Sequence, residues 1–447
     1  MRRMVPPQLP LVAPFVAQTM GRELATISGH LDQILDDRLL GLIKADLTAD
    51  LTSPERGREG LSADLTLRVL ILKQRFDLSY DELEFHLADS RSMRAFCRLG
   101  WDEKPSRSAL QRSCKRLSAS TLEAINQQLL RRAVEDGIES GSTIRTDCTV
   151  TETNIHAPSD SSLLNDCVRV LTRLLTNAQE VGVEFAFGDH TRRAKRRAIG
   201  IQHARRKKAR VPLYRDLVRV TKSVLGYAEA ALAGLDKMKG AAHQALRDQL
   251  QRHLELGERV VDQTTRRVFA GETVPATEKV LSIFEDHTDI IIKDWRDTHY
   301  GHKLCLSSGV SGLVTDLVVE SGNPADSTLA VRAAERHLKV YGAVPVEMAF
   351  DGGFASRANL DELKALGVSE VCFAKGRGLT VDEMASSARV YRRLRNFRAG
   401  IEAGISRLKR AFGLSRCRWR GLASFHTHAW ASVLAANLLT LARIGPA

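Results

Sequence analysis

The chain has 447 residues, which is enough for two or three domains that each bury a core. Lysine and arginine number 66 against 53 aspartates and glutamates, so the formal net charge is +13 and we expect a polyanionic partner, either nucleic acid or an anionic membrane face. No apolar run reaches the roughly eighteen residues of a membrane span, which argues against an integral membrane protein.

The N-terminus and the cysteines favour a cytoplasmic protein. Residues 1–15 combine a basic start with an apolar stretch, but prolines at positions 6, 7, 10 and 14 interrupt it, so we predict no signal peptide. The seven cysteines are dispersed without a Cys-x-x-Cys pair, which favours reduced thiols over a disulfide framework or a structural zinc site.

Residues 1–135 are predicted to form a helical N-terminal domain. Asp64 can cap one helix, the Ser79-x-x-Glu82 spacing of a capping box opens a second, and Ser106 begins a third. Basic residues surround the apolar positions of that third helix: Arg107, Arg112, Lys115 and Arg116. The pattern fits a DNA-binding helix-turn-helix and equally a small bundle whose charges are solvated.

A strand is predicted next, where the periodicity changes to two. Apolar or β-branched residues at positions 144, 146, 148 and 150 alternate with Arg145, Asp147 and Thr149. A carboxylate inside a strand is costly unless it is paired or binds a metal. We favour metal binding for Asp147, and the alternative is a salt bridge to Arg145.

Residues 161–277 return to a helical pattern with a dense basic stretch. Between positions 191 and 210, ten cations occur without an acidic residue: Arg192, Arg193, Lys195, Arg196, Arg197, Arg205, Arg206, Lys207, Lys208 and Arg210. Such charges are usually solvated surface, but so dense a run repels itself unless an anion lies across it. We therefore expect it to bind phosphate backbone without reading sequence.

Strands and helices alternate over residues 278–447. We predict strands at 280–284, 290–293, 303–307, 313–320, 346–350 and 370–374, with a hairpin turn at 309–312, and helices at 327–340, at 357–366 and from about 384 onward. Asp351 follows the strand 346–350 and precedes Gly352-Gly353, which permit close backbone approach at the end of a strand, where α/β sheets bind ligands. The alternative is an aspartate that caps a turn. The pattern predicts an α/β core, at 142–160 and 278–447, interrupted by a helical insertion at 161–277.

Glu402 is the most informative acid, because it is the only one among the residues from 384 to 447. Arg398, Glu402 and Lys409 lie on one face of a predicted helix. Gly400 and Gly404 each weaken that helix by roughly 1 kcal/mol, which suggests that something packs closely there. Simple pairing with Arg398 is the alternative, but a DNA-facing helix that keeps one metal ligand better explains why other acids are excluded.

The three acids and their surroundings resemble the DDE transposases of bacterial insertion sequences. Arg398, Glu402 and Lys409 match the R-x(3)-E-x(6)-K part of the Y-R-E-K signature, although Arg395 stands where the signature has tyrosine. Asp351-Gly352-Gly353-Phe354 resembles the second-aspartate motif. The first-aspartate region is matched by three stretches, at 145–147, 154–156 and 159–164. Gly301-His302-Lys303 resembles the start of the next core strand, and the stretches 78–83 and 105–108 resemble the N-terminal domain of this family.

The resemblance implies an RNase H-like mixed sheet flanked by helices, with the helical insertion after the first core strand. It implies that Asp147, Asp351 and Glu402 are catalytic and hold two Mg²⁺ or Mn²⁺ ions for DNA cleavage and strand transfer. Arg398 and Lys409 would then contact phosphates near the scissile bond, and His156 would either orient a phosphate or be structural. The implied partners are double-stranded DNA, as terminal repeats and target, and further copies of the chain in a homodimer or larger synaptic assembly at the bacterial nucleoid.

Two other functions share the same residues. An RNase H-like nuclease would use these carboxylates to cut DNA without joining it. A catalytically silent DNA-binding protein would retain only the shape, and the presence of all three acids argues against it.

Overall fold

The computed structural model describes residues 4, 20–51, 60–100, 102–293 and 297–444. The chain forms two compact units, one of Met1–Thr153 with Gly301–Ala447 and one of Asn154–Tyr300. The signal-peptide prediction concerns residues 1–15, which lie outside the described residues except for Met4. The predicted domain limits, 1–135, 142–160 with 278–447, and 161–277, stay predictions.

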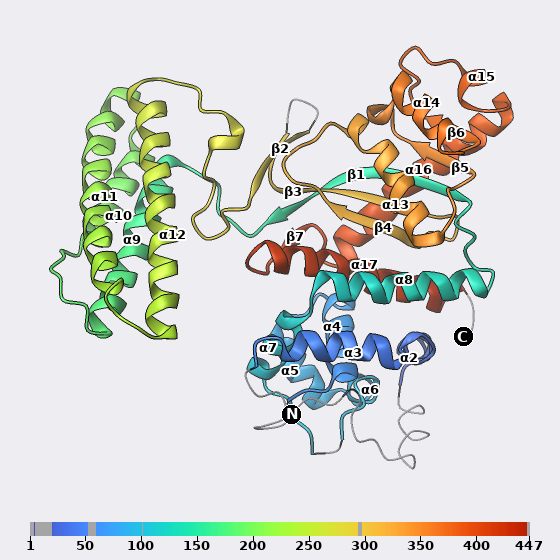
Figure 1. Cartoon of the computed structure of the whole chain (residues 1–447), viewed down its shortest axis with the longest axis horizontal. Coiled ribbons are helices and arrows are strands. Elements are labelled where there is room, and N and C mark those ends of the chain that lie inside the picture. Colours follow the sequence, from blue (N-terminus) through green and yellow to red (C-terminus); the bar gives the residue numbers. More distant parts are fainter. Residues whose placement is uncertain (1–3, 5–19, 52–59, 101, 294–296, 445–447) are drawn as a thin grey trace. The chain divides into compact units, whose positions relative to one another are not determined.

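Most of a mixed sheet lies in the first unit, while β2 and the residues of β3 before Gly301 belong to the second. The strands of the sheet are β1 (Thr143–Thr153), β2 (Asp289–Lys293), β3 (Asp297–Ser308), β4 (Val314–Val319), β5 (Glu347–Phe350), β6 (Glu370–Phe373) and β7 (Arg416–Cys417). The order is β2-β3-β1-β5-β6, with β4 also on β3 and β7 also on β1. β1 is antiparallel to β3 and parallel to β5, and β5 is parallel to β6. The predicted RNase H-like mixed sheet flanked by helices is confirmed (Figure 1).

Helices and short turns connect and cover the later strands. They are η4 (Asp326–Thr328), α13 (Ala330–Tyr341), η5 (Gly352–Phe354), α14 (Arg357–Ala365), α15 (Val381–Met384) and α16 (Ala388–Ala411). α16 packs on β1, β5 and β6 through a buried stripe that contains Leu394, Ile401 and Leu408. This packing holds the helix that carries Glu402 against the centre of the sheet.

One predicted strand, at 280–284, is wrong. The segment is irregular, yet Val280 and Ile283 are buried against the helices of the second unit. Side chains replace a strand ladder there, because the Val280 N–H donates to Gln263 Oε1 (2.8 Å) and the Glu285 N–H donates to Ser282 Oγ (3.2 Å). A short apolar run therefore signalled burial but not strand pairing.

Helices from both ends of the sequence share one hydrophobic core in the first unit. These helices are α2 (Arg22–Ile34), α3 (Asp37–Thr48), α4 (Ala63–Arg75), α5 (Tyr80–Asp89), α6 (Arg91–Phe96), α7 (Arg107–Arg116), α8 (Ala119–Glu135) and α17 (Leu422–Ile444). The predicted capping box of Ser79 and Glu82 is present, and Ser106 caps α7. Asn437 of α17 donates to Asn126 of α8 and accepts from the N–H of Val314 in β4, each at 2.8 Å, so the helical layer is tied to the sheet.

The second unit is a bundle of helices. It contains α9 (Asp160–Glu180), α10 (Thr191–His203), α11 (Lys207–Leu235) and α12 (Ala241–Thr264), followed by the π-helical turn η2 (Thr265–Phe269) and the 3₁₀ turn η3 (Ala276–Glu278). The four long helices lie side by side around a core of leucine, valine and alanine (Figure 1). None of the helices in the described part of the chain is both long and apolar enough to cross a membrane.

Candidate active site

Asp147 lies at the centre of the sheet, on β1, with a side chain that is only 15% exposed. Its Oδ1 accepts the N–H of Cys148 at 2.7 Å. Burial raises the pKa of this carboxyl above its usual value, while the Cys148 N–H and Arg398 oppose the rise and the nearby carboxylates of Asp351 and Asp326 add to it. Keeping Asp147 ionised in this buried position therefore costs free energy, and a bound cation would offset that cost.

Asp351 directly follows β5 and lies beside Asp147 of the neighbouring strand β1. Thr146 of β1 is opposite Phe350 of the parallel strand β5, so the next residue on each strand is one of the two aspartates. Both glycines after Asp351 are needed for space. A Cβ on Gly352 would lie 2.7 Å from the Cβ of Lys375, and one on Gly353 would lie 2.8 Å from Asp326 Oδ2. The predicted close approach at this turn is present.

Glu402 reaches the site from α16, where Arg398 lies one turn before it. The predicted tight approach to this helix holds at Gly400, where the guanidinium of Arg145 crosses the helix and leaves no room for a Cβ. Arg145 donates to the Phe397 carbonyl (2.8 Å) and to Ser308 Oγ (2.9 Å), so it does not form the salt bridge with Asp147 that we weighed as an alternative. Nothing lies within 4 Å of a Cβ on Gly404, so the expectation fails there.

One guanidinium contacts all three predicted carboxylates. Arg398 Nη2 lies 3.1 Å from Asp147 Oδ2 and 3.3 Å from Asp351 Oδ1, and Nη1 lies 2.9 Å from Glu402 Oε1. The pairing of Glu402 with Arg398 is therefore real, but it is one part of a three-way contact. Within the described residues, no three His, Cys, Asp or Glu side chains stand close enough to share one metal ion.

The formal charge of this carboxylate cluster, defined as Asp147, Asp351, Glu402 and Arg398, is negative. Three carboxylates face one guanidinium, and the side chains of Asp351 and Glu402 are 44% and 65% exposed. Each of these two uses one oxygen toward Arg398, and its second oxygen has no hydrogen-bond partner within the described residues. Hard oxygen donors with an excess of negative charge suit Mg²⁺ or Mn²⁺.

Asp326, which the sequence analysis missed, lies beside the cluster. It begins η4, its Oδ2 is over Gly353, and its Oδ1 forms an ion pair with Lys303 Nζ at 2.5 Å. Lys303 belongs to the Gly301-His302-Lys303 motif on β3 and is nearly buried. The available signal was a polar turn after the carboxyl end of a predicted strand, as for Asp351, but without a flanking glycine pair.

The predicted DNA-binding residues of the second unit divide into two groups. Arg193 and Arg197 both pair with Asp216 of α11 at 2.5 Å, so these two charges are compensated by an acid outside the basic stretch. The others are exposed and form no ion pair within the described residues: Arg192, Arg196, Arg205, Arg206, Lys207 and Lys208. His156 is bonded to Asp166 (2.9 Å), which raises the pKa of the histidine.

Lys409 lies on α16, nearly two turns beyond Glu402.

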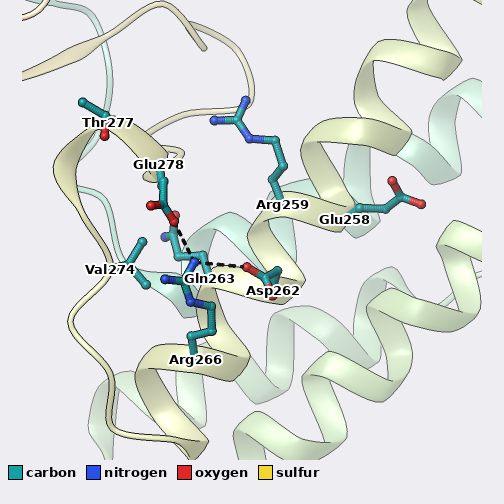
Figure 2. A pocket seen from close by; sticks show the side chains of 8 residues that line it. All are labelled: Glu258, Arg259, Asp262, Gln263, Arg266, Val274, Thr277 and Glu278. Carbon is teal, nitrogen blue, oxygen red and sulfur yellow. Dashed lines mark hydrogen bonds and ion pairs between the residues drawn. The ribbon is translucent and has the colours of Figure 1, made fainter.

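A separate cavity of about 490 Å³ lies in the second unit between α12 and η3. Figure 2 shows Arg266 pointing between Asp262 and Glu278, with ion pairs of 3.6 and 2.7 Å. Its cationic group is already occupied by acids of the protein, so this cavity is poorly suited to phosphate.

Comparison with protein families identifies the chain. A model described as a transposase DDE domain matches residues 286–438, and a model described as a transposase domain (DUF772) matches residues 20–116. The chain belongs to the insertion-sequence DDE transposases. The transposase functions in transposition and binds DNA, and its family in general uses divalent metal ions. No curated protein and no solved structure matches it significantly.

Proposed function

We propose that this transposase cleaves DNA and transfers strands through Asp147, Asp351 and Glu402, which together hold two Mg²⁺ or Mn²⁺ ions. The observation that carries the proposal is the shared contact of all three carboxylates with Arg398, within 3.3 Å, although they come from β1, the end of β5 and α16. Carboxylates that are distant in sequence repel one another when they are brought together, so such a cluster is costly unless it binds a common positive charge.

Metal ions bound here would activate a water and then a 3′-hydroxyl as nucleophiles and would stabilise the leaving oxygen. The side chains of the transposase prepare for this chemistry. The N–H of Cys148 fixes the rotation of the Asp147 carboxylate, and the parallel register of β1 and β5 fixes Asp351 beside it. Glu402, on a helix packed over both strands, supplies the more exposed third carboxylate.

Arg398 is proposed to bind a phosphate of the substrate as well as the acids. Its Nε has no hydrogen-bond acceptor in the described part of the chain, so the guanidinium keeps one unused donor. Lys409 and the unpaired cations of α10 and the start of α11 are proposed to hold DNA backbone without reading sequence. We also propose that two or more copies of the chain act together on two DNA ends.

A strand-transfer assay tests the catalytic proposal. Labelled duplexes that carry the element ends are incubated with Mg²⁺, and cleaved and joined products are separated. Asp147→Asn, Asp351→Asn and Glu402→Gln should each abolish both products but retain binding in a gel shift. Asp361→Asn, an exposed aspartate on α14, is the matched control and should behave as wild type.

The outcomes separate the candidate functions. Joined products that the three variants lose support transposition by these acids, whereas cleavage without joining supports a nuclease. Metal-independent binding with neither product supports a silent DNA-binding protein. Variants that still cut would refute the assignment of the carboxylates.

A further inference from the structure

A basic cleft of about 460 Å³ lies within the first unit, apart from the residues of the carboxylate cluster. It lies between the helices α4, α5 and α7 on one side and the segment from Gly413 to Arg420 on the other. Six cationic and two acidic side chains line it. We define the basic cleft by the six residues that form its two facing walls: Arg107, Gln111, Lys115, Arg416, Arg418 and Arg420.

One wall is a polar face of α7. Arg107, Gln111 and Lys115 are spaced by four residues, so they lie above one another on the same side of the helix. Leu110 and Cys114, on the adjacent side of the helix, are fully buried in the core. The core therefore fixes the rotation of α7 and directs these three polar side chains into the cleft.

The other wall begins as the short strand β7 and continues as irregular chain through Arg420, with alternating burial. Arg416, Arg418 and Arg420 are exposed, whereas Cys417 and Trp419 between them are 1% and 8% exposed. Alternate residues of an extended chain point to the same side and lie about 6.6 Å apart. The three exposed arginines therefore line one side of the cleft, a distribution of charge that suits a polymer of anions better than one small ion.

The charge of the cleft is largely uncompensated. Asp81 pairs with Arg107 at 3.0 Å, and Glu152 pairs with Arg416 at 2.5 Å. Both pairs are well exposed, so they hold these arginines only weakly. In the described ranges, Lys115, Arg418 and Arg420 make no ion pair. Lys73 at the floor differs: burial lowers its pKa, and its ammonium donates to the Leu78 carbonyl at 2.7 Å.

We propose that the basic cleft binds the sugar-phosphate backbone of duplex DNA, with Gln111 placed to reach a base edge. The proposal rests on the function of the chain as a DNA transposase. Counterion release favours a row of arginines, of which Arg418 and Arg420 make no ion pair in the described ranges, as a backbone site. A glutamine amide on a helix can pair with the N6 and N7 groups of adenine in a major groove. The cleft would thus hold DNA through groups that take no part in strand cleavage.

The test compares two variants of the full-length transposase that each remove two charges from one wall. These are Arg418→Gln with Arg420→Gln, and Arg107→Gln with Lys115→Gln. Binding of a short fluorescent duplex of mixed sequence is measured by anisotropy in EDTA at several salt concentrations. Each lost phosphate contact should flatten the slope of log K against log [salt] by about 0.9, so either variant should lose about 1.8. Arg131→Gln with Lys339→Gln, two exposed cations on α8 and α13, is the charge-matched control.

The result that would overturn the proposal is an unchanged slope in either wall variant, or an equal change in the control. A flattened slope in only one wall also overturns it, because the two walls are proposed to hold one duplex. Lysine in place of the three arginines, and arginine in place of Lys115, keeps the charge and should leave binding as in the wild type, which separates charge loss from misfolding. Because EDTA prevents cleavage, this binding result does not depend on whether the three acids prove catalytic.

Discussion

Replacing Arg398 by glutamine removes the one cation that contacts all three candidate carboxylates. The pair with Asp147 dominates, because both side chains are 15% exposed and the contact is a charged hydrogen bond worth roughly 1.5–3 kcal/mol. The pair with Glu402 is largely exposed and contributes only about 0.5 kcal/mol. Glutamine retains a donor, so we expect the free energy of unfolding in EDTA to fall by about 2 kcal/mol.

Added Mg²⁺ should reverse this loss. Without Arg398, three negative charges lack a counter-charge, so a divalent ion should bind the variant more tightly than it binds the wild type. Binding to the folded state raises stability by mass action. Denaturation followed with and without Mg²⁺ should therefore show a larger metal-dependent gain for Arg398→Gln than for wild type, although cleavage by the variant is impaired.

The control is Arg392→Gln, an exposed arginine on the same helix that contacts none of the acids. It should leave both the stability in EDTA and the response to Mg²⁺ unchanged. If Arg398→Gln matches wild type in EDTA, or if Mg²⁺ stabilises both proteins equally, then the carboxylates do not act as one charged cluster.

Three further predictions concern other parts of the chain. Gly353→Ala places a Cβ 2.8 Å from Asp326 Oδ2 and should slow cleavage on the order of 100-fold by displacing the turn that follows Asp351, whereas Gly404→Ala meets nothing within 4 Å and should leave cleavage unchanged. His428 is buried, accepts a hydrogen bond from Gln74 and donates one to the Gly413 carbonyl, and burial lowers its pKa to about 4. Because the unfolded chain takes up the proton near pH 6.5, the free energy of unfolding should fall by about 3 kcal/mol between pH 6.5 and 4. A His428→Gln variant that shows the same fall would contradict this assignment. Changing Arg192, Lys195 and Arg196 together to glutamine should flatten the slope of log K for DNA binding against log [salt] by about 2.7. Changing Arg193 and Arg197, which are paired with Asp216, to glutamine should flatten this slope less per charge. Equal effects per charge would show that the two ion pairs open when DNA binds.

The three candidate acids could be found from sequence because each has a local pattern. Asp147 interrupts the alternation of a strand, Asp351 ends an apolar run before two glycines, and Glu402 stands alone in a basic helix. The strands around the first two and the helix around the third are present. Their catalytic role stays a prediction, since what the structure adds is their common contact with Arg398.

Contacts across long sequence separations could not be predicted in this way. Asp216 neutralises Arg193 and Arg197 only because α11 returns beside α10, so a count of charges along the stretch overestimated its excess. The segment 280–284 is as apolar as a strand, but Gln263 and Ser282 satisfy its backbone. Asp216 and Gln263, which decide these two outcomes, lie on other helices, and the local periodicity of a segment does not predict which helix packs beside it.

Asp326 shows how the same limitation applies within the candidate site. Nothing in its own neighbourhood distinguishes it from an ordinary turn aspartate. Its position follows from two long-range contacts, the ion pair with Lys303 across the β3–β4 hairpin and the packing of η4 on η5 that places it over Gly353. Through these contacts it adds a fourth carboxylate near Asp147 and helps to raise the pKa of that residue. Because Lys303 balances its charge, Asp326 brings a further oxygen atom next to the turn that follows Asp351 without adding to the net negative charge.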